Sequence, residues 1–257
     1  MVGSIPLLSV DAVTLQYCVP GRLVTAVHDV SFEVLTGDRF VILGPSGCGK
    51  SSLLKAIAGF GKPSAGSFRL DGVPITRPGP DRMMVFQDLD QLLPWQTVAG
   101  NVVSALRRAA GLSRAEAEIR AAEMIGRVGL AKFAGAYPHT LSGGMKQRAA
   151  LARALALRPA MLLMDEPFAA LDALTRATMQ RELLDLSLDM DLTVLFVTHS
   201  VEEALLIGTR ILVLSAHPGQ VRAEFRGLGP DASPAAKDHL KQRIETLIME
   251  TNLSHAG

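Results

Sequence analysis

The sequence has few cysteines and no excess of charge of either sign. Its two cysteines are Cys18 and Cys48, and the second lies in a glycine-rich stretch where a disulfide is awkward. This usage favours a reducing cytoplasm. The 26 Lys and Arg against 25 Asp and Glu leave a formal net charge of +1, so no overall field attracts nucleic acid or anionic lipid. We therefore expect no nucleic-acid partner.

Long apolar runs and an amino-terminal export signal are also missing. Of the 257 residues 48% are hydrophobic, yet charges or prolines interrupt every run before the roughly 20 apolar residues that a membrane-spanning helix needs. The start, MVGSIP, lacks the basic flank and apolar stretch of a secretory signal. With 20% charged residues the composition is typical of a globular chain with a large core, and we expect one two-lobed domain.

Short strand and helix patterns alternate along the chain. Residues 31–43 form two β-rich runs around a Thr-Gly-Asp turn, and helical spacing of apolar residues begins at position 51. The run 161–164 is apolar without alternation, as in a strand buried on both faces of a mainly parallel sheet. Residues 101–158 are rich in Ala, Arg, Leu and Glu and predict helices. The pattern indicates an α/β fold.

The strongest local motif is GPSGCGKS at residues 44–51, which matches G-x-x-x-x-G-K-[ST] between a predicted strand and a predicted helix. Glycines allow successive backbone N–H groups to turn around phosphate oxygens, and the helix N-terminus adds partial positive charge. We expect Lys50 to bridge the β- and γ-phosphates and the Ser51 hydroxyl to bind Mg²⁺. The predicted phosphate-binding residues are Gly44, Pro45, Ser46, Gly47, Cys48, Gly49, Lys50, Ser51 and Ser52.

Two adjacent carboxylates follow the apolar run 161–164. We expect Asp165 to hold Mg²⁺, through water, and Glu166 to act as the general base that activates water. The alternative is that Asp-Glu-Pro only turns the chain after a strand. The phosphate loop in the same chain favours the catalytic interpretation, because open α/β sheets place ligands at the carboxyl ends of their strands.

A second helix start suited to an anion is LSGGMKQR, in which Ser142 is a candidate N-cap and Gly143 and Gly144 leave the helix end open. One nucleotide cannot easily use two such helix ends in a chain that already surrounds its phosphates. The motif therefore indicates that these residues face the nucleotide of another subunit, in a head-to-tail ATP sandwich. The alternative is an ordinary Ser-Gly-Gly helix start.

Together these motifs resemble the nucleotide-binding subunit of ATP-binding cassette (ABC) transporters over about residues 7–221. LSGGMKQR resembles the family signature, and the segment ending at Glu166 resembles its Walker B strand. Residues 168–172 resemble the D-loop, which includes Asp172, and Gln87 resembles the Q-loop glutamine. His199 resembles the switch histidine. All of these motifs occur in the family's order.

The resemblance implies a role for each of these residues. Gln87 would offer its amide oxygen to Mg²⁺ or to the attacking water, and His199 would hydrogen-bond the γ-phosphate. Tyr17 sits where the family places an aromatic ring that stacks on adenine. A surface glutamine, a structural histidine and a half-buried strand tyrosine are the alternatives. Many relatives carry Asp at the position of Ser200, and because Ser also caps helices, we expect no loss of catalysis.

The resemblance also implies the architecture. It predicts a P-loop NTPase (RecA-like) α/β fold, with a mainly parallel sheet core, an antiparallel β lobe and an inserted helical subdomain. Within a single nucleotide-binding domain over 1–257, the core lobe would take about 1–90 and 160–226, and the helical subdomain about 95–158. Ser233 as cap and a proline in the first turn predict a C-terminal helix over about 233–252.

Three segments, 78–98, 165–176 and 215–219, resemble the branch that imports nitrate, aliphatic sulfonates and taurine. Importers of thiamine-precursor pyrimidines and of riboflavin share these features, so the solute stays open. Residues 92–98 contain the chain's only tryptophan, Trp95, and are expected to contact a permease. Packing of Trp95 between lobes is the alternative.

The resemblance thus implies an ATPase with ATP and Mg²⁺ as cofactors. Its partners would be a second copy, integral-membrane permease subunits and, indirectly, a periplasmic or lipid-anchored solute-binding protein, and it would sit peripherally at the cytoplasmic face of the inner membrane. One alternative is a soluble ABC-type ATPase without a membrane partner. Another is a nonhydrolytic regulatory module, against which the intact Glu166, Gln87 and His199 argue.

Overall fold

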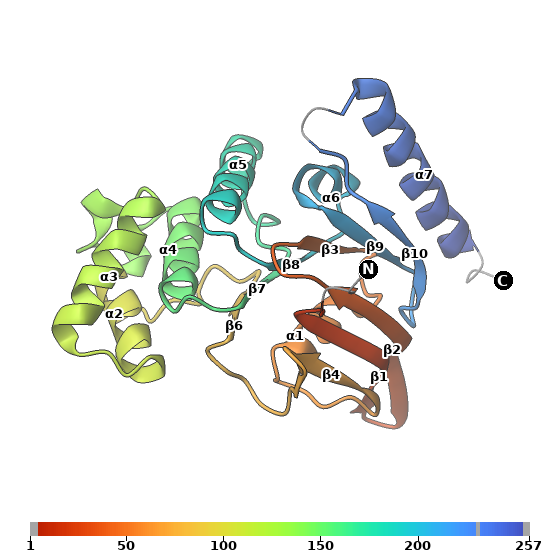
Figure 1. The fold of residues 1–257 in the computed structure, drawn as a ribbon, viewed down its shortest axis with the longest axis horizontal. Coiled ribbons are helices and arrows are strands. Elements are labelled where there is room, and N and C mark those ends of the chain that lie inside the picture. Colours follow the sequence, from red (N-terminus) through yellow and green to blue (C-terminus); the bar gives the residue numbers. More distant parts are fainter. Residues whose placement is uncertain (1–4, 230–231, 254–257) are drawn as a thin grey trace. The chain divides into compact units, whose positions relative to one another are not determined.

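The computed structural model of the chain describes residues 5–229 and 232–253, and the chain forms two compact units with α/β structure. Unit 1 comprises Met1–Pro78 and Asp191–Gly257, and unit 2 comprises Gly79–Met190. Figure 1 shows the ribbon of both units. Each unit carries part of the predicted machinery.

Unit 1 contains an antiparallel sheet in the order β2-β1-β4-β5. Its strands are β1 (Leu8–Val19), β2 (Arg22–Val34), β4 (Ala65–Leu70) and β5 (Val73–Pro74). Leu8 pairs with Val34 on one side and with Leu70 on the other, and all three side chains are buried. Figure 1 shows β1, β2 and β4 side by side in red to orange. The alternation of buried and exposed residues along β1 is what a sheet with one solvated face requires.

A second sheet in unit 1 runs in the order β10-β9-β3-β8. Its strands are β3 (Arg39–Leu43), β8 (Val194–Thr198), β9 (Arg210–Leu214) and β10 (Val221–Arg226), and only β10 is antiparallel to its neighbour. Every residue of β8 is buried, as are the last four of β3. Continuous apolar runs of this kind suit strands covered on both faces. The helices of unit 1 are α1 (Lys50–Ile57), α6 (Val201–Ile207) and α7 (Pro234–Leu253).

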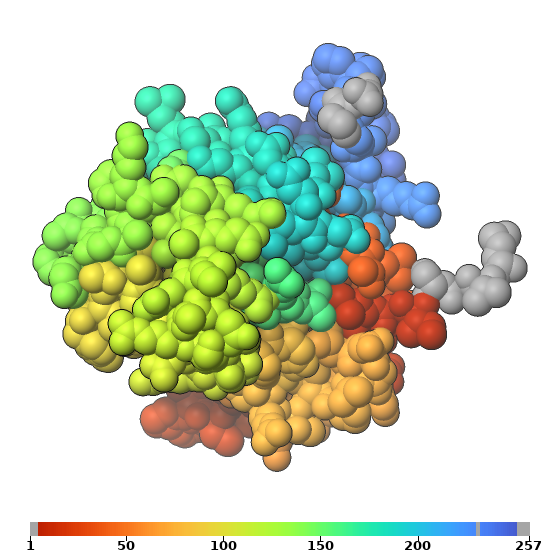
Figure 2. All heavy atoms as spheres, turned by 60° about the vertical axis from the view of Figure 1, so that its left-hand side comes forward, coloured from red at the N-terminus to blue at the C-terminus, as the bar shows by residue number. Residues whose placement is uncertain are grey.

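In unit 2 the strands β6 (Arg82–Val85) and β7 (Met161–Asp165) pair in parallel. The helices are α2 (Val98–Ala109), α3 (Arg114–Arg127), α4 (Gly143–Ala156) and α5 (Ala173–Asp189), with 3₁₀ turns at Ala131–Phe133 and Pro138–Thr140. In Figure 2 the atoms of α2 and α3, yellow to yellow-green, face the viewer as one closed surface. Ser113 and Glu116 form the reciprocal hydrogen bonds of a capping box at the start of α3.

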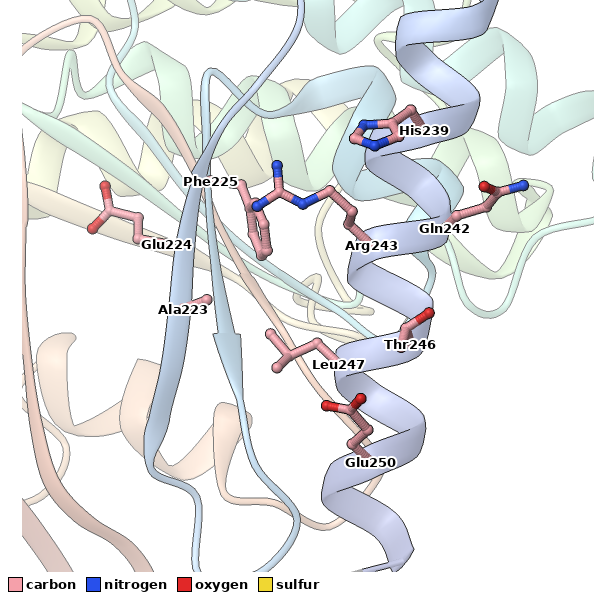
Figure 3. A pocket seen from close by; sticks show the side chains of 9 residues that line it. All are labelled: Ala223, Glu224, Phe225, His239, Gln242, Arg243, Thr246, Leu247 and Glu250. Atoms are coloured by element: carbon pink, nitrogen blue, oxygen red, sulfur yellow. The ribbon is translucent and has the colours of Figure 1, made fainter.

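The C-terminal helix α7 packs within unit 1. The hydroxyl of Ser233 accepts a hydrogen bond from the Ala236 amide at 3.2 Å, as the sequence predicts for this cap. Leu240 and Ile244 are buried, on the helix face turned to the unit. Helix α7 forms a groove of about 540 Å³ with β10. The Arg243 guanidinium lies 5.4 Å from the centre of the Phe225 ring. Figure 3 shows the side chains that line the groove.

Among residues 5–229 and 232–253, no helix has the length and hydropathy needed to span a bilayer.

Candidate nucleotide-binding site

The predicted phosphate loop connects β3 to α1 in unit 1. The backbone is left-handed at Gly47 (φ +80°) and Gly49 (φ +97°), and α1 begins directly at Lys50. The first turn of α1 contains no acidic residue, so its free N–H groups and partial positive charge are left for an anion. The loop therefore has the backbone conformation that a phosphate cradle requires.

Lys50 lies within this loop and is 4% exposed. Its Nζ donates hydrogen bonds to the carbonyl oxygens of Gly44 at 2.8 Å and Pro45 at 2.7 Å. A buried ammonium needs such partners, because an uncompensated charge is costly away from water. Since both partners are neutral carbonyls, an anionic phosphate oxygen can form a stronger, charge-assisted bond with the same group.

Of the loop glycines, Gly49 has the least space for a side chain. A Cβ there would lie 2.5 Å from the Ala26 carbonyl oxygen and 2.7 Å from Cγ1 of Val27, whereas one at Gly47 would meet nothing within 4 Å. Strand β2 therefore fixes the loop at Gly49 by direct backbone contact, and the glycine at this position has a packing reason as well as a chemical one.

We expect Gly49→Ala to destabilise the protein more than Gly47→Ala. Both variants place an alanine at positive φ, which costs about 1 to 2 kcal/mol. Only Gly49→Ala adds a clash with β2, which should cost about 1 to 3 kcal/mol more. Urea unfolding of the nucleotide-free chain measures the difference, with Gly47→Ala as the matched control. Equal stabilities of the two variants would contradict this account.

The predicted switch histidine follows β8, and β3 and β8 are parallel neighbours, with Leu43 opposite Thr198. The phosphate loop and His199 therefore leave the same edge of the unit 1 sheet. The side chain of His199 is exposed. Ser200 is the N-cap of α6 (Val201–Ile207), and its hydroxyl accepts a hydrogen bond from the Glu203 amide at 3.3 Å, as expected of Ser at this position.

Tyr17 lies near the end of β1, where it pairs with Val24 of β2, and its side chain is 44% exposed. It belongs to the antiparallel sheet of unit 1 and not to the strand ends that carry the phosphate loop. A half-exposed tyrosine on a strand has an aromatic face that can stack on a base.

In unit 2 the two carboxylates lie at the carboxyl end of β7, which extends one residue beyond the predicted strand 161–164. Asp165 is the last residue of the strand and is 4% exposed. Glu166 has φ +42°, an uncommon backbone conformation for a residue with a side chain. Strain of this kind is concentrated at functional sites. Gln87 follows the neighbouring parallel strand β6 and is exposed, so it leaves the same sheet edge as Asp165 and Glu166.

The signature motif begins α4 in unit 2. The Ser142 hydroxyl accepts a hydrogen bond from the Met145 amide at 3.3 Å, which is the predicted N-cap, and the first turn has no acidic residue. A Cβ at Gly144 would lie 2.7 Å from Cγ2 of Thr175, and one at Gly143 would lie 3.1 Å from Leu89. The two glycines therefore allow close packing as well as an open helix end.

Asp172 caps α5. One of its carboxylate oxygens accepts from the Leu174 and Thr175 amides at 3.1 and 3.0 Å, and the other accepts from the Thr175 hydroxyl at 2.6 Å. The hydrogen bond from the Thr175 side chain, followed by that from its backbone, lowers the pKa of Asp172. The residue therefore fixes the D-loop to the start of α5.

A group of contacts that sequence reasoning missed joins α4 to the segment after Gln87. Lys146 pairs with Asp90 at 2.8 Å, and Arg153 donates to the Gln91 carbonyl at 2.8 Å. The Gln91 amide donates to Gln147 Oε1 at 3.4 Å. These partners are about 60 residues apart in the sequence, and no local pattern identifies them. They attach the signature helix to the Q-loop segment.

The sequence pattern of the family described as "ABC transporter" matches residues 27–169. The chain belongs to the ABC transporter family. The predicted family is thereby confirmed. Membership establishes a nucleotide-binding ATPase whose hydrolysis is coupled to transport.

Two relatives illustrate the similarity. The taurine import ATP-binding protein TauB of Rhizobium johnstonii is 52% identical over 205 residues, which are 80% of this chain and 78% of TauB. The nitrate import ATP-binding protein NrtC of Synechococcus elongatus is 46% identical over 213 residues, 82% of this chain but 32% of NrtC.

Solved structures agree on the fold. The dimeric ATP-binding cassette MJ0796 bound to ADP and Pi superposes with a TM-score of 0.75 at 32% identity, covering 86% of this chain and 99% of that one. CbiO1 from Clostridium perfringens superposes with a TM-score of 0.78 at 25% identity, covering 98% and 96%. The predicted P-loop α/β fold is therefore confirmed.

Proposed function

We propose that this ATPase energises the uptake of a small anionic solute, of the taurine, aliphatic sulfonate or nitrate type, through a separate permease. The observation that carries the proposal is the 52% identity with a taurine import ATP-binding protein over 80% of the chain. The similarity to a nitrate import ATP-binding protein supports the same class of solute. Taurine, sulfonates and nitrate share a compact group of oxygens that carries negative charge.

ATP is the proposed nucleotide. The phosphate loop, residues 44–52, would bind its phosphates, with Lys50 at the β- and γ-phosphates, and Tyr17 would stack on adenine. Stacking of this kind contributes roughly 1 to 3 kcal/mol. The left-handed glycines of the loop and the exposed face of Tyr17 support these assignments.

Mg²⁺ is the proposed metal, and its candidate ligands are Ser51, Gln87 and Asp165. All three offer oxygen atoms, which are the donors that this hard cation prefers. When bound, the cation neutralises charge that develops on the phosphates. Asp165 at the buried end of β7 supplies the only full negative charge among the three side chains.

Glu166 is the proposed general base. Its carboxylate accepts a proton from water as the water oxygen bonds to the γ-phosphorus and the bond from phosphorus to the bridging oxygen breaks, which yields ADP and inorganic phosphate. Gln87 orients the attacking water. His199 donates a hydrogen bond to the γ-phosphate and so stabilises the charge that develops there.

A second copy of the chain is the proposed partner at the nucleotide. Its Ser142, Gly143, Gly144 and Asp172 would face the ATP held by the first copy's phosphate loop. The open, acid-free N-terminus of α4 supports this role, because such a helix end favours an anion. The similarity to the dimeric MJ0796 cassette supports the pairing.

The remaining partners are permease subunits and, indirectly, a periplasmic or lipid-anchored solute-binding protein, with the ATPase at the cytoplasmic face of the cell membrane. Trp95 is 70% exposed and offers a large apolar side chain for a permease contact. When two copies close over ATP, the permease would change the side of the membrane to which it opens. ATP hydrolysis would then let the two copies separate.

Uptake by the assembled complex tests the proposed function. The tagged chain is purified from solubilised membranes with its permease and reconstituted in proteoliposomes that contain ATP. We expect uptake of labelled taurine, an alkanesulfonate or nitrate, and none with the Glu166→Gln variant as control. Uptake of only riboflavin or a pyrimidine would refute the proposed solute class. A chain that hydrolyses ATP but brings no membrane protein with it would refute the transport role.

A further inference from the structure

A series of side-chain contacts connects the C-terminal helix α7 to the segment that carries His199. Lys241 Nζ of α7 binds Glu202 Oε1 of α6 at 2.5 Å. The other oxygen of Glu202 accepts a hydrogen bond from the Ser200 hydroxyl at 3.2 Å. Ser200 is the residue that directly follows His199. The side chains of Lys241, Glu202 and Ser200 therefore connect α7 to the backbone next to His199.

The backbone on both sides of His199 is held by a second group of contacts. Thr198 is 1% exposed, and its hydroxyl donates to Glu203 Oε2 at 2.6 Å. The same hydroxyl accepts from the Ser200 amide at 3.0 Å, and the Glu203 amide donates to the Ser200 hydroxyl. Ser200 thus belongs both to this buried clamp and to the link with α7. A shift of Ser200 would move the backbone at His199.

Helix α7 is fixed well enough to serve as an anchor. Leu240, next to Lys241 in sequence, is 8% exposed, and Ile244 is 0% exposed. In Figure 3 the Arg243 side chain reaches from α7 to the Phe225 ring of β10, with the cation over the aromatic face. Lys241 therefore extends from a helix that is attached to both α6 and β10.

Serine suits position 200 better than aspartate would. The hydroxyl accepts one hydrogen bond, from the Glu203 amide, and donates another to Glu202. An aspartate could accept as the helix cap, but it could not donate to Glu202, and the two carboxylates would repel each other. The Ser200 hydroxyl therefore serves both as the cap of α6 and as part of the link to α7.

We propose that Lys241 and Glu202 are positioning residues of the ATPase reaction, which hold Ser200, and through it the backbone at His199, in place from the C-terminal helix. The inference rests on the proposed role of His199. Glu202 keeps its negative charge because the Lys241 hydrogen bond lowers its pKa, and the same bond raises the pKa of Lys241. Both groups are therefore ionised at neutral pH.

We expect Lys241→Met in the full chain to lower kcat for ATP hydrolysis about two- to five-fold, the range of exposed ion pairs, without changing KM for ATP. The side chains of Lys241 and Glu202 are 36% and 67% exposed, so the loss should be modest. Lys241→Arg should restore the rate. Lys237→Met, which removes the same charge one turn away on α7, is the matched control and should match the wild type.

Combination with His199→Ala separates positioning from a general structural effect. His199→Ala should lower kcat by about 10²-fold. In that background Lys241→Met should have no further effect, because its influence passes through the histidine. An unchanged kcat in Lys241→Met, a raised KM, or an equal loss with and without His199 would overturn the positioning role alone. Wild-type turnover of His199→Ala would refute the proposed role of His199, and the positioning with it.

Discussion

Glu166→Gln is expected to bind ATP with unchanged affinity and to lose about 10²- to 10⁴-fold in turnover, the usual contribution of a general base. Glutamine has nearly the same shape as glutamate but cannot accept the proton of the attacking water at neutral pH. The residue follows the buried strand β7, where its positive φ aims the side chain in a direction that ordinary strand geometry does not give.

Phosphate release under saturating ATP measures this loss, and fluorescent-nucleotide titration measures affinity. Glu118→Gln is the control, because Glu118 is an exposed glutamate on α3 whose partner is Arg114. It should leave turnover unchanged. Wild-type turnover in Glu166→Gln would remove Glu166 from the catalytic role, and a large loss of ATP affinity would show that it acts in binding.

Lys50→Ala should weaken ATP binding itself, by about 10- to 150-fold, because hydrogen bonds between charged groups contribute about 1.5 to 3 kcal/mol. The ammonium is held on the carbonyls of Gly44 and Pro45 at the loop and is almost fully buried. Removal of the Lys50 ammonium also takes away the hydrogen-bond donor of these two carbonyls. Part of the loss of ATP affinity would therefore come from a change in the shape of the loop.

Isothermal titration with an ATP analogue in the presence of Mg²⁺ measures this affinity. The matched control is Lys55→Ala, since Lys55 is exposed on the same helix α1 five residues later. Its removal should leave the dissociation constant within about two-fold of the wild type. Undiminished affinity in Lys50→Ala would refute the assignment of this lysine to the phosphates.

Local chemistry made part of the site predictable from the sequence. Turn glycines, cap residues and buried apolar runs act over a few residues, so the loop at 44–51 and the helix starts at Ser113, Ser142 and Ser200 follow from short patterns. The α/β fold could be predicted because apolar runs without alternation imply strands covered on both faces.

Contacts between distant segments could not be predicted in this way. Lys241 and Glu202 are 39 residues apart, and Gln91 and Gln147 are 56 apart, so their meeting depends on how the helices pack. The left-handed backbone of Glu166 is equally hidden, because it arises where β7 ends and not from the residue's own preference. Sequence patterns thus miss contacts that depend on long-range packing and backbone conformations that depend on local strain.

The central claim is that two copies of the chain complete each nucleotide pocket, with the phosphate loop from one and Ser142 from the other. Mixing two defective variants, Lys50→Ala and Ser142→Arg, tests it most directly, at an ATP concentration that saturates the wild type but not Lys50→Ala. In each mixed dimer one pocket would carry both substitutions and the other would carry neither. Because about half of the dimers in a 1:1 mixture are mixed, the mixture should recover up to roughly a quarter of the wild-type ATPase rate. A mixture that stays inactive while mixed dimers form would contradict the claim, because it would mean that each chain completes its own pocket.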